Sequence, residues 1–321
     1  MSERKKGLVP RLRFPEFREA GEWEEITLDD VCERIMDGTH FSPKSKSGPY
    51  LYLTSKNVRQ GFLVLNDVSH ISADEHKSIF TRCPVKKNDL LLTKDGASTG
   101  NCALNPLDYE FSLLSSVAVI RGNNENILQE FLAHDFQSRH VQDQIFDAIA
   151  GQAITRITLE KIKRFKVWSI SLKEQQKIAA CLTTLDALIA AQADKLDALK
   201  THKQGLMQRL FPREGETVPR LRFPEFREAG EWEEITLGKI AKFISGGTPS
   251  KDVADYWKGS IPWISASSMH DIKIEKSDFS ITDAAVKAGT RIAKKGTLLL
   301  LVRGTDLYTY LTPSLSQEVS S

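Results

Sequence analysis

The chain has 321 residues, which exceeds the usual size of a single domain and is long enough for two hydrophobic cores. Charged residues make up 27% and hydrophobic residues 40% of the sequence, so the composition excludes a disordered or membrane-embedded protein. The net charge of +2 does not identify a nucleic-acid-binding protein, because an acidic face can mask a cationic one.

The first six residues are basic, but polar residues follow them in place of the apolar run of a signal peptide. No later stretch approaches the apolar length that a helix needs to cross a bilayer. We therefore expect a cytoplasmic protein that does not associate with membranes.

An exact repeat sets the organisation of the chain. The segment VPRLRFPEFREAGEWEEITL at residues 9–28 recurs unchanged at residues 218–237. The offset of 209 residues (218 minus 9) is far longer than a solenoid period, so the repeated unit is a whole domain plus a spacer. Residues 9–18 follow neither a helical nor a strand period, which predicts an extended connector at the start of each repeat.

The first repeat continues with short apolar or β-branched runs separated by Gly, Pro, Asn and Asp, a pattern typical of strands in a mixed α/β domain. We expect these strands at residues 50–53, 62–65, 89–93 and 113–120. A helix is expected at residues 126–149, where Ile127, Phe131, Ile145 and Ile149 recur at helical intervals before Gly151.

Two loops of the first repeat combine cations with amide side chains: THFSPKSK at residues 39–46 and TSKNVRQ at residues 54–60. Duplex DNA is bound through cations that contact phosphates and through hydrogen-bonding side chains that contact base edges. An ordinary solvated surface contains the same residue types, so both interpretations stay open. The candidate DNA contacts in these loops are Lys44, Lys46, Lys56, Asn57, Arg59 and Gln60.

Residues 151–166 are the densest basic stretch of the first repeat, with five cations against the single acid Glu160. Arg156 and Lys163 are candidates for phosphate contacts, although a solvated helical face explains the stretch equally well. The preceding segment KDGASTG at residues 94–100 lacks the Gly-Lys-Ser/Thr order of a P-loop and predicts a turn.

A long helix is predicted from the capping box at Ser171 to the Phe211-Pro212 pair, where proline ends it. Apolar residues alternate there in steps of four and three, as in the a/d seam of a coiled coil, with Gln192 and Lys203 as its polar members. At about 1.5 Å per residue the helix spans roughly 55 Å, or one and a half turns of DNA at about 34 Å per turn. The alternative is that the stripe packs on its own domain. The residues expected to pair with a partner helix are Ile178, Leu182, Leu185, Ile189, Leu196, Leu199, Leu206 and Leu210.

The second repeat follows the first only loosely after residue 237. WISA at residues 263–266 corresponds to YLTS at residues 52–55, and KKGTLLLLVRG at residues 294–304 corresponds to KKNDLLLTKDG at residues 86–96. Residues 306–321 do not continue the correspondence. We therefore expect an incomplete second domain, produced by a premature stop or an altered reading frame.

Residues 172–211 resemble the helical region of type I restriction-modification specificity subunits. In that family a Glu-Gln pair opens a long helix, Ile-Ala and Leu-x-x-x-Asp-x-x-Ile follow, and Lys-x-x-Leu-Met-Gln-x-Leu-Phe ends it. PRLRFPEF followed by Trp23 or Trp232 is similar to the beginning of each recognition domain, and Gln152, Ile154 and residues 158–162 resemble its end. The matching helix positions are Glu174, Gln175, Ile178, Ala179, Leu182, Asp186, Ile189, Lys203, Leu206, Met207, Gln208, Leu210 and Phe211.

The resemblance implies an α+β (mixed α/β) target-recognition domain at residues 1–171, a coiled-coil spacer helix at 172–212 and a partial second target-recognition domain at 213–321. It also implies that the KDG turn with Lys94 lies near the DNA backbone. Methyltransferase subunits would dock on the spacer helix, and a separate motor-nuclease subunit would cut double-stranded DNA. S-adenosylmethionine, ATP and magnesium would then belong to those partners, and this chain would have no cofactor of its own.

The family pairs two long helices in antiparallel fashion, whereas this sequence contains one. An unpaired seam leaves apolar surface in contact with water, which is unfavourable by about 25 cal/mol for each Å² that a partner could bury. We expect either a second copy of the chain, which gives a homodimer that reads a palindromic split target, or the methyltransferase subunits to cover it.

An enzymatic function finds no support in the sequence. Seven histidines show no paired spacing, and the four cysteines Cys32, Cys83, Cys102 and Cys181 have no zinc-ligand spacing. No methyltransferase, helicase or nuclease motif is present, so we expect no catalytic residue and no metal site. The alternative to a DNA-specificity subunit is a truncated scaffold that binds other proteins through its coiled coil.

Overall fold

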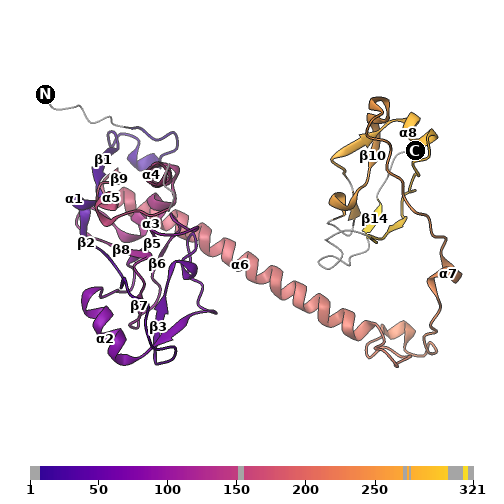
Figure 1. The fold of residues 1–321 in the computed structure, drawn as a ribbon, viewed down its shortest axis with the longest axis horizontal. Coiled ribbons are helices and arrows are strands. Elements are labelled where there is room, and N and C mark those ends of the chain that lie inside the picture. The colour runs from indigo at the N-terminus through magenta and orange to yellow at the C-terminus, as the bar shows by residue number, and fades with distance from the viewer. Residues whose placement is uncertain (1–7, 151–154, 270–272, 275, 303–313, 317–321) are drawn as a thin grey trace. The chain divides into compact units, whose positions relative to one another are not determined.

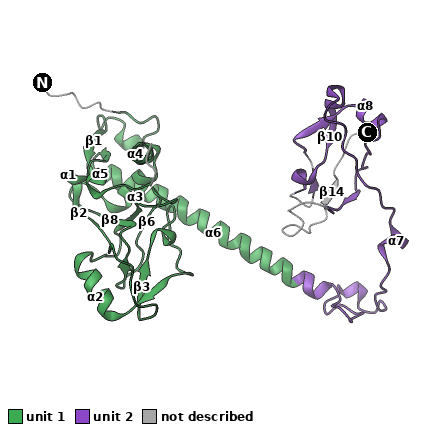
Figure 2. Cartoon of the chain, viewed as in Figure 1, with its two compact units in different colours: residues 1–205 green, residues 206–321 purple. Residues whose placement is uncertain are grey.

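The computed structural model describes residues 8–150, 155–269, 273–274, 276–302 and 314–316. The chain divides into two compact units, Met1–Gly205 and Leu206–Ser321, which Figure 2 shows in different colours. No helix in the described ranges is both long and apolar enough to cross a membrane.

Unit 1 is built on a four-stranded antiparallel sheet with the order β2-β8-β5-β6 (Figure 1). The strands are β2 (Cys32–Asp37), β8 (Val117–Gly122), β5 (Leu90–Thr93) and β6 (Cys102–Leu104). Every residue of β5 and β8 is buried, because both faces of the sheet are covered. Alternate residues therefore enter two different cores: Leu90 and Leu92 face one, and Leu91 faces the other.

Helices cover the first face of this sheet. α3 (Gln129–Gln137) and α4 (Arg139–Ile149) pack on it together with the short helices α1 (Leu28–Val31) and α5 (Leu159–Lys163). A two-stranded ribbon of β1 (Glu24–Thr27) and β9 (Lys166–Ser169) closes this side. The predicted single helix at 126–149 is thus two helices, because Ser138 is extended (φ −70°, ψ 156°) and breaks the pattern.

A second layer covers the other face. It contains the strands β4 (Ser69–Ile71), β3 (Tyr50–Leu53) and β7 (Ser112–Leu113), which pair in the order β4-β3-β7. The helix α2 (Ala73–Arg82), which comes directly after β4 in the chain, also belongs to this layer. The expected strands at 50–53, 89–93 and 113–120 are confirmed, with the last divided between β7 and β8. The strand expected at 62–65 is wrong, since only an isolated bridge joins Leu63 to Val58.

The spacer α6 (Leu172–Leu210) is a continuous helix of 39 residues, as expected. Its first turns belong to the core of unit 1, where Glu174, Gln175 and Ala179 are buried and Ile178 packs on the main cluster. Residues 180–204 are all exposed. The alternative that the whole apolar stripe packs on its own domain therefore holds only for the beginning of the helix.

Unit 2 contains smaller sheets. β10 (Trp257–Trp263) pairs with β12 (Phe279–Ile281), and β11 (Lys273–Ile274), β14 (Ser314–Ser316) and β13 (Leu298–Leu299) form a sheet in the order β11-β14-β13. The helices α7 (Leu237–Ile240) and α8 (Asp283–Lys287) and the 3-10 turns η3 (Pro224–Phe226), η4 (Ala254–Tyr256) and η5 (Ala266–Ser268) complete the described part. Its small core centres on Ile261, Ile281 and Ala285.

Two backbone positions show that the repeats share a framework beyond the identical segment. Gly48 lies just before β3, and Gly259 lies in β10 at the bulge of its pairing with β12; a Cβ at either would collide with the carbonyl oxygen of Ile71 or Ile281. Asn88 and Gly296, two residues before β5 and β13, both adopt positive φ, 67° and 82°. Gln152, Ile154 and most of the tail 306–321 lie outside the described residues.

The connector segments are not extended, which corrects the prediction. The first connector, residues 8–23, folds back on itself through η1 (Pro15–Phe17) and a pair of backbone hydrogen bonds between Leu8 and Trp23. The second connector, residues 217–232, repeats this fold with η3 and a hydrogen bond from Trp232 to the carbonyl of Thr217. The Pro-Glu-Phe turn reverses the chain in both.

Candidate nucleic-acid interface

Several loops of the first repeat meet at one edge of the main sheet. β2 and β5 end there, and β8 begins there, because both strands run antiparallel to β8. The amide of Ser115 donates to the carbonyl of Thr39, that of Lys94 donates to Ser116, and that of Ser55 donates to the Ser116 hydroxyl. We call this edge, formed by residues 37–39, 54–60, 94–101 and 115–116, the loop edge.

Lys94 is a structural residue of the loop edge, which corrects its expected role as a DNA contact. Its side chain is 2% exposed, and its Nζ lies 3.1 Å from Oδ2 of Asp37. A lysine is buried in this way only when an acid pairs with it. Lys94 therefore joins the end of β5 to the end of β2, and its ammonium is not accessible to a phosphate.

Asn57 is likewise an internal support and not a base-reading side chain. It is 1% exposed. Its Oδ1 accepts from the amide of Thr54 at 2.9 Å, and its Nδ2 donates to the carbonyl oxygens of Val64 and Asp67. These bonds saturate the amide group, so Asn57 shapes the loop that presents its neighbours.

Lys56, Arg59 and Gln60 are the outward members of the same loop. Lys56 pairs with the exposed Asp67 at 3.1 Å, a contact that a phosphate can replace. Within the described residues the guanidinium of Arg59 makes no ion pair and donates only to the carbonyl of Val58. Gln60 accepts from the amide of Cys102 through Oε1, which leaves its NH₂ group to donate outward.

Lys44 and Lys46 lie at the other end of β3, near the start of α2. Their loop is held by Glu75, whose carboxylate accepts from the Ser45 hydroxyl and from the backbone amides of Lys44 and Ser45. These hydrogen bonds, that of the Ser45 hydroxyl first, lower the pKa of Glu75. Both lysines are exposed and form no ion pair with any described residue. They constitute a second cationic patch, separated from Arg59 by the length of β3.

A cavity of about 320 Å³ opens beside this second patch. Lys46, Tyr52, Ser69 and His70 are among the residues that line it. Burial of the Tyr52 side chain raises the pKa of its hydroxyl to about 12, so the group stays protonated and can act as a hydrogen-bond donor.

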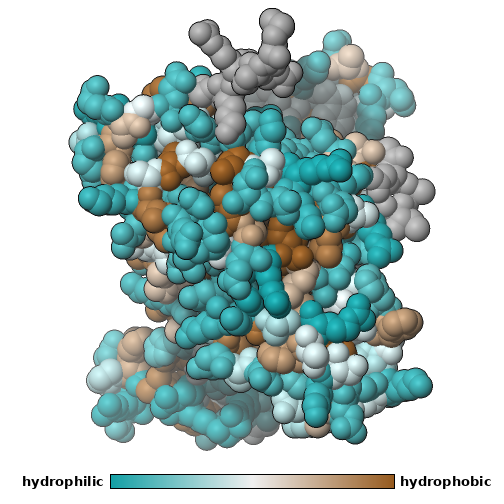
Figure 3. All heavy atoms as spheres, turned by 90° about the vertical axis from the view of Figure 1, so that its left-hand side faces the viewer, coloured by the Kyte–Doolittle hydropathy of each residue, from teal (hydrophilic) through white to brown (hydrophobic). Residues whose placement is uncertain are grey.

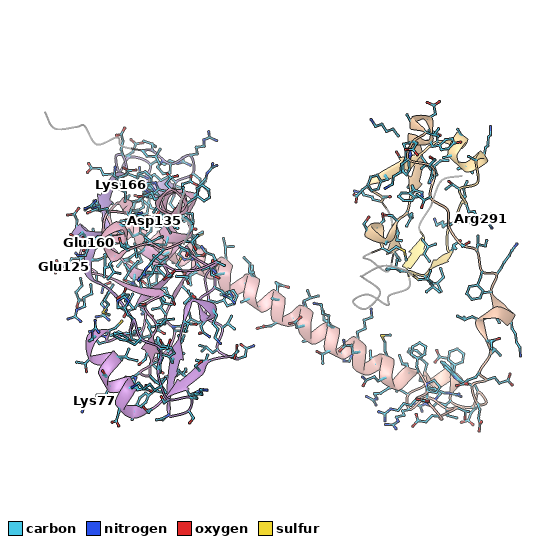
Figure 4. All side chains as sticks on the ribbon, viewed as in Figure 1. Lys77, Glu125, Asp135, Glu160, Lys166 and Arg291 are labelled. Atoms are coloured by element: carbon cyan, nitrogen blue, oxygen red, sulfur yellow. The ribbon has the colours of Figure 1, made fainter. Side chains whose placement is uncertain are left out.

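The structure does not bring the two remaining candidates together. Arg156 lies at the loop edge, where its Nε is 3.7 Å from Oδ2 of Asp95. Lys163 lies on α5 and pairs with Glu160 at 3.3 Å. In Figure 4, Glu160 lies with Lys166 in the upper part of unit 1, whereas Lys77 marks α2 at the bottom. Lys163 is therefore remote from Lys44 and Lys46.

A polar clamp at the start of α6 was not predicted. Arg13 donates to both carboxylate oxygens of Glu174, at 2.7 and 2.8 Å, and the indole of Trp23 donates to Oε1 at 3.3 Å. Gln175 donates to the carbonyls of Asn126 and Ile170 and accepts from the amide of Leu128. The exact repetition of Arg and Trp in both connectors was the signal that could have revealed it.

The candidate pairing residues of α6 form a long apolar stripe that is interrupted only by Gln192 and Lys203. Ile178 packs on the core of unit 1, and Leu206 and Leu210 are half-buried. The face of the molecule that Figure 3 shows is mostly hydrophilic, with its apolar residues in small patches. The exposed members, with 38% to 67% of their surface accessible, are Leu182, Leu185, Ile189, Leu196 and Leu199.

The cysteines show no reactive arrangement. Burial raises the pKa of Cys32, Cys83 and Cys102 to about 12, which keeps these thiols protonated and inert. Cys181 is exposed on α6. Among the described residues, no group of three or more His, Cys, Asp or Glu side chains could hold a metal ion.

Comparison with known proteins places these features in a family. The model of the type I restriction modification DNA specificity domain matches residues 20–201 and 229–317. The specificity subunit of type I restriction enzyme MjaVIII from Methanocaldococcus jannaschii is 24% identical over 241 residues, which cover 73% of this chain and 52% of that protein. The EcoR124I/EcoR124II specificity subunit of Escherichia coli is 39% identical over 92 residues, 28% of this chain and 22% of the relative.

The fold has a counterpart among solved structures. The S subunit of a type I restriction-modification system from M. genitalium aligns with a TM-score of 0.54 at 17% identity. The alignment covers 91% of this chain and 69% of that one. This likeness confirms the mixed α+β domain with a long helix. The chain spans about half the length of the archaeal relative that it matches over most of its own length.

Proposed function

The chain belongs to the type I restriction modification DNA specificity family, and from this premise we propose that it reads one part of a split duplex DNA target. The observation that carries the proposal is a set of exposed cations on loops held by a rigid framework. Lys44, Lys46 and Arg59 are exposed or half-buried and lack an ion pair within the described residues. Loops positioned by a scaffold are the usual place for binding residues.

In this proposal some side chains contact the phosphates of the DNA and others contact the base edges. Lys44, Lys46, Lys56 and Arg59 contact phosphates and set the position of unit 1 on the duplex. Gln60 offers an outward amide that can donate to a base edge in the major groove. Lys94 and Asn57 do not contact DNA themselves but hold in place the loops that carry these groups.

The chain itself catalyses no reaction in this proposal. Methyltransferase subunits that bind S-adenosylmethionine, and a motor-nuclease subunit that uses ATP and magnesium, supply the chemistry. In this proposal the target-recognition domain comprises residues 1–171, the spacer residues 172–212, and the second repeat residues 213–321. The exposed length of α6 gives the methyltransferase subunits a surface on which to dock.

A second copy of the chain covers the apolar stripe of α6. Parallel pairing would place Lys203 against Lys203 of the partner, two like charges in one layer, so we favour the antiparallel arrangement. In that arrangement an a position of one helix faces a d position of the other. The two-fold assembly then presents two identical reading units and recognises a palindromic split sequence.

The polar members of the stripe select one antiparallel register. With Leu196 opposite Leu199 of the second copy, Gln192 faces Lys203, Ile189 faces Leu206 and Leu185 faces Leu210, while Leu182 lies beyond the paired length of the two helices. A shift by one heptad would instead place Gln192 against Leu196 and Lys203 against Leu185. It would also require Ile178, which already packs on the core of unit 1. Burying a polar group against an apolar one is unfavourable, so the first register is preferred.

Co-expression with a methyltransferase subunit tests the function. We expect adenines to become methylated at one split, palindromic sequence, which genome-wide mapping of methylated bases would identify. If the chain binds the methyltransferase but no sequence is methylated, the scaffold alternative replaces the proposal. An asymmetric target would contradict the homodimer and leave DNA reading intact.

A further inference from the structure

The two connectors share a sequence and a local fold, yet they differ in the residues that their side chains bind. Arg13 in the first connector and Arg222 in the second occupy equivalent positions. Arg13 donates through Nη1 to the carbonyl of Gly21 at 2.6 Å, and Arg222 donates through Nη2 to the equivalent carbonyl of Gly230 at 2.7 Å. Each arginine therefore closes the turn of its own connector.

The first connector uses its remaining groups to hold the first turn of α6. Nε and Nη2 of Arg13 take the carboxylate of Glu174, and Trp23 adds a third hydrogen bond. One turn later, Nζ of Lys177 lies 3.2 Å from Oε1 of Glu16 and 5.5 Å from the ring centre of Phe14. Four connector side chains thus recognise a glutamate and a lysine three residues apart.

The second connector has the same four side chains without that occupant. Nε of Arg222 is buried and has no hydrogen-bond partner among the described residues. Phe223 and Trp232 are exposed over 59% and 46% of their surface. A buried donor that lacks an acceptor is unfavourable, and a carboxylate would satisfy it through a charge-assisted bond.

Glu174 of the same chain does not fill this position, because Arg13 already binds both of its oxygens. The second connector is instead in contact with the other end of α6. The amide of Leu221 donates to the carbonyl of Arg209, and the ring of Trp232 packs edge-on against Phe211, with centroids 5.9 Å apart. The surface of the second connector that corresponds to the Glu174-binding surface of the first connector is therefore not filled by any described residue.

We propose that the second connector is a docking site for the first turn of another helix of the type Ser171–Lys177. Its occupant is a separate helix start that carries glutamate three residues after its cap and lysine three residues later. The glutamate binds Arg222 and Trp232, and the lysine binds Glu225 and Phe223. This is a protein-binding site distinct from the DNA-reading loops, and it does not depend on them.

A peptide with the sequence of residues 168–184, labelled with fluorescein and with serine at position 181, tests the proposal against the full chain by fluorescence anisotropy. We expect Glu174→Gln in the peptide to weaken binding about 10- to 100-fold, the range for a hydrogen bond to a charged group. Arg222→Gln in the chain should weaken binding of the unmodified peptide equally. The two changes together should weaken binding no further, since they remove the same interaction.

Arg220→Gln is the matched control, because among the described residues Arg220 forms an ion pair only with the nearby Glu216, at 3.0 Å, and the change should leave peptide binding unchanged. The peptide does not displace the chain's own α6 from Arg13, since a covalently attached segment has an effective concentration of about 1 mM or more. The proposal is overturned if the glutamate and glutamine peptides bind equally, if Arg222→Gln has no effect, or if the unmodified peptide does not bind at about 1 mM.

Discussion

Arg13 and Glu174 lie 161 residues apart in the sequence and form a fork of two hydrogen bonds, 2.7 Å from Nε to Oε1 and 2.8 Å from Nη2 to Oε2. Two parallel hydrogen bonds of this kind fix the relative orientation of the guanidinium and the carboxylate as well as their distance. Glu174 is 1% exposed and sits in the first turn of α6. The start of the spacer helix is therefore locked to the N-terminal connector by a polar contact.

Replacing Glu174 with glutamine should lower the urea midpoint of unit 1, because the fork loses its charge and one acceptor becomes a donor that faces Arg13. Circular dichroism during urea unfolding measures this change. Lys177→Ala is the control: it removes the more exposed pair with Glu16 and should shift the midpoint less. Equal shifts for both variants would show that the fork does not anchor the helix.

Asp89→Asn should destabilise unit 1 by about 3 kcal/mol, the effect of leaving one partner of a buried ion pair without its counter-charge. Asp89 is 2% exposed and takes two hydrogen bonds of 2.7 Å from Arg121 between β5 and β8. The free energy of unfolding in urea measures the destabilisation. Asp197→Asn on α6, where the pair with Lys200 is exposed, should change it by less than about 0.5 kcal/mol.

Asp135 should make the free energy of unfolding fall as the pH rises above the ordinary pKa of an aspartate, 3.8. Burial raises the pKa of Asp135 above its ordinary value of 3.8, against the hydrogen bond from the amide of Trp168 and the charge of His140. Between 3.8 and the raised value, the folded state holds more protons than the unfolded state, so the free energy of unfolding decreases with pH.

Asp135→Asn removes this titration. Its urea midpoint, measured in steps from about pH 4 to about pH 7, should rise relative to that of the unsubstituted chain. Parallel curves for the two proteins would mean that Asp135 keeps an ordinary pKa despite its burial.

Replacing Lys56 and Arg59 together with alanine should weaken DNA binding and reduce the slope of log affinity against log salt by about 1 for each phosphate that the protein no longer neutralises. Titration of the co-expressed complex with duplex DNA at several salt concentrations measures both. Lys163→Ala is the matched control, because that lysine lies on α5 and pairs with Glu160. An unchanged slope for the double variant would remove both residues from the interface.

The proposed register predicts which cysteines can form a disulfide between two chains. In a background without native cysteines, Leu196→Cys in one chain should link to Leu199→Cys in another. Gln192→Cys and Leu196→Cys, which the register shifted by one heptad would bring together, should not link. Non-reducing electrophoresis distinguishes the two. Efficient linking of the second pair would contradict the register, and a monomer in analytical ultracentrifugation would contradict the homodimer.

The sequence by itself determined the features that arise from local periodicity and repetition. The capping box at Ser171 and the four-three spacing up to Leu210 located α6 almost to the residue, because helix formation depends on neighbours a few positions away. The exact repeat predicted two domain-sized copies, and the helix motif predicted the family, which the family model confirms. The break at Ser138 was missed, since helical intervals continue across it on both sides.

Only the tertiary structure decided which polar side chains face water. Lys94 and Arg59 are both cations in loops, yet the first is buried on Asp37 and the second has no ion pair within the described chain. Contacts between residues far apart in sequence made that difference, and no local pattern encodes them. The fork between Arg13 and Glu174 depended in the same way on a chain path that brings the two ends of unit 1 together.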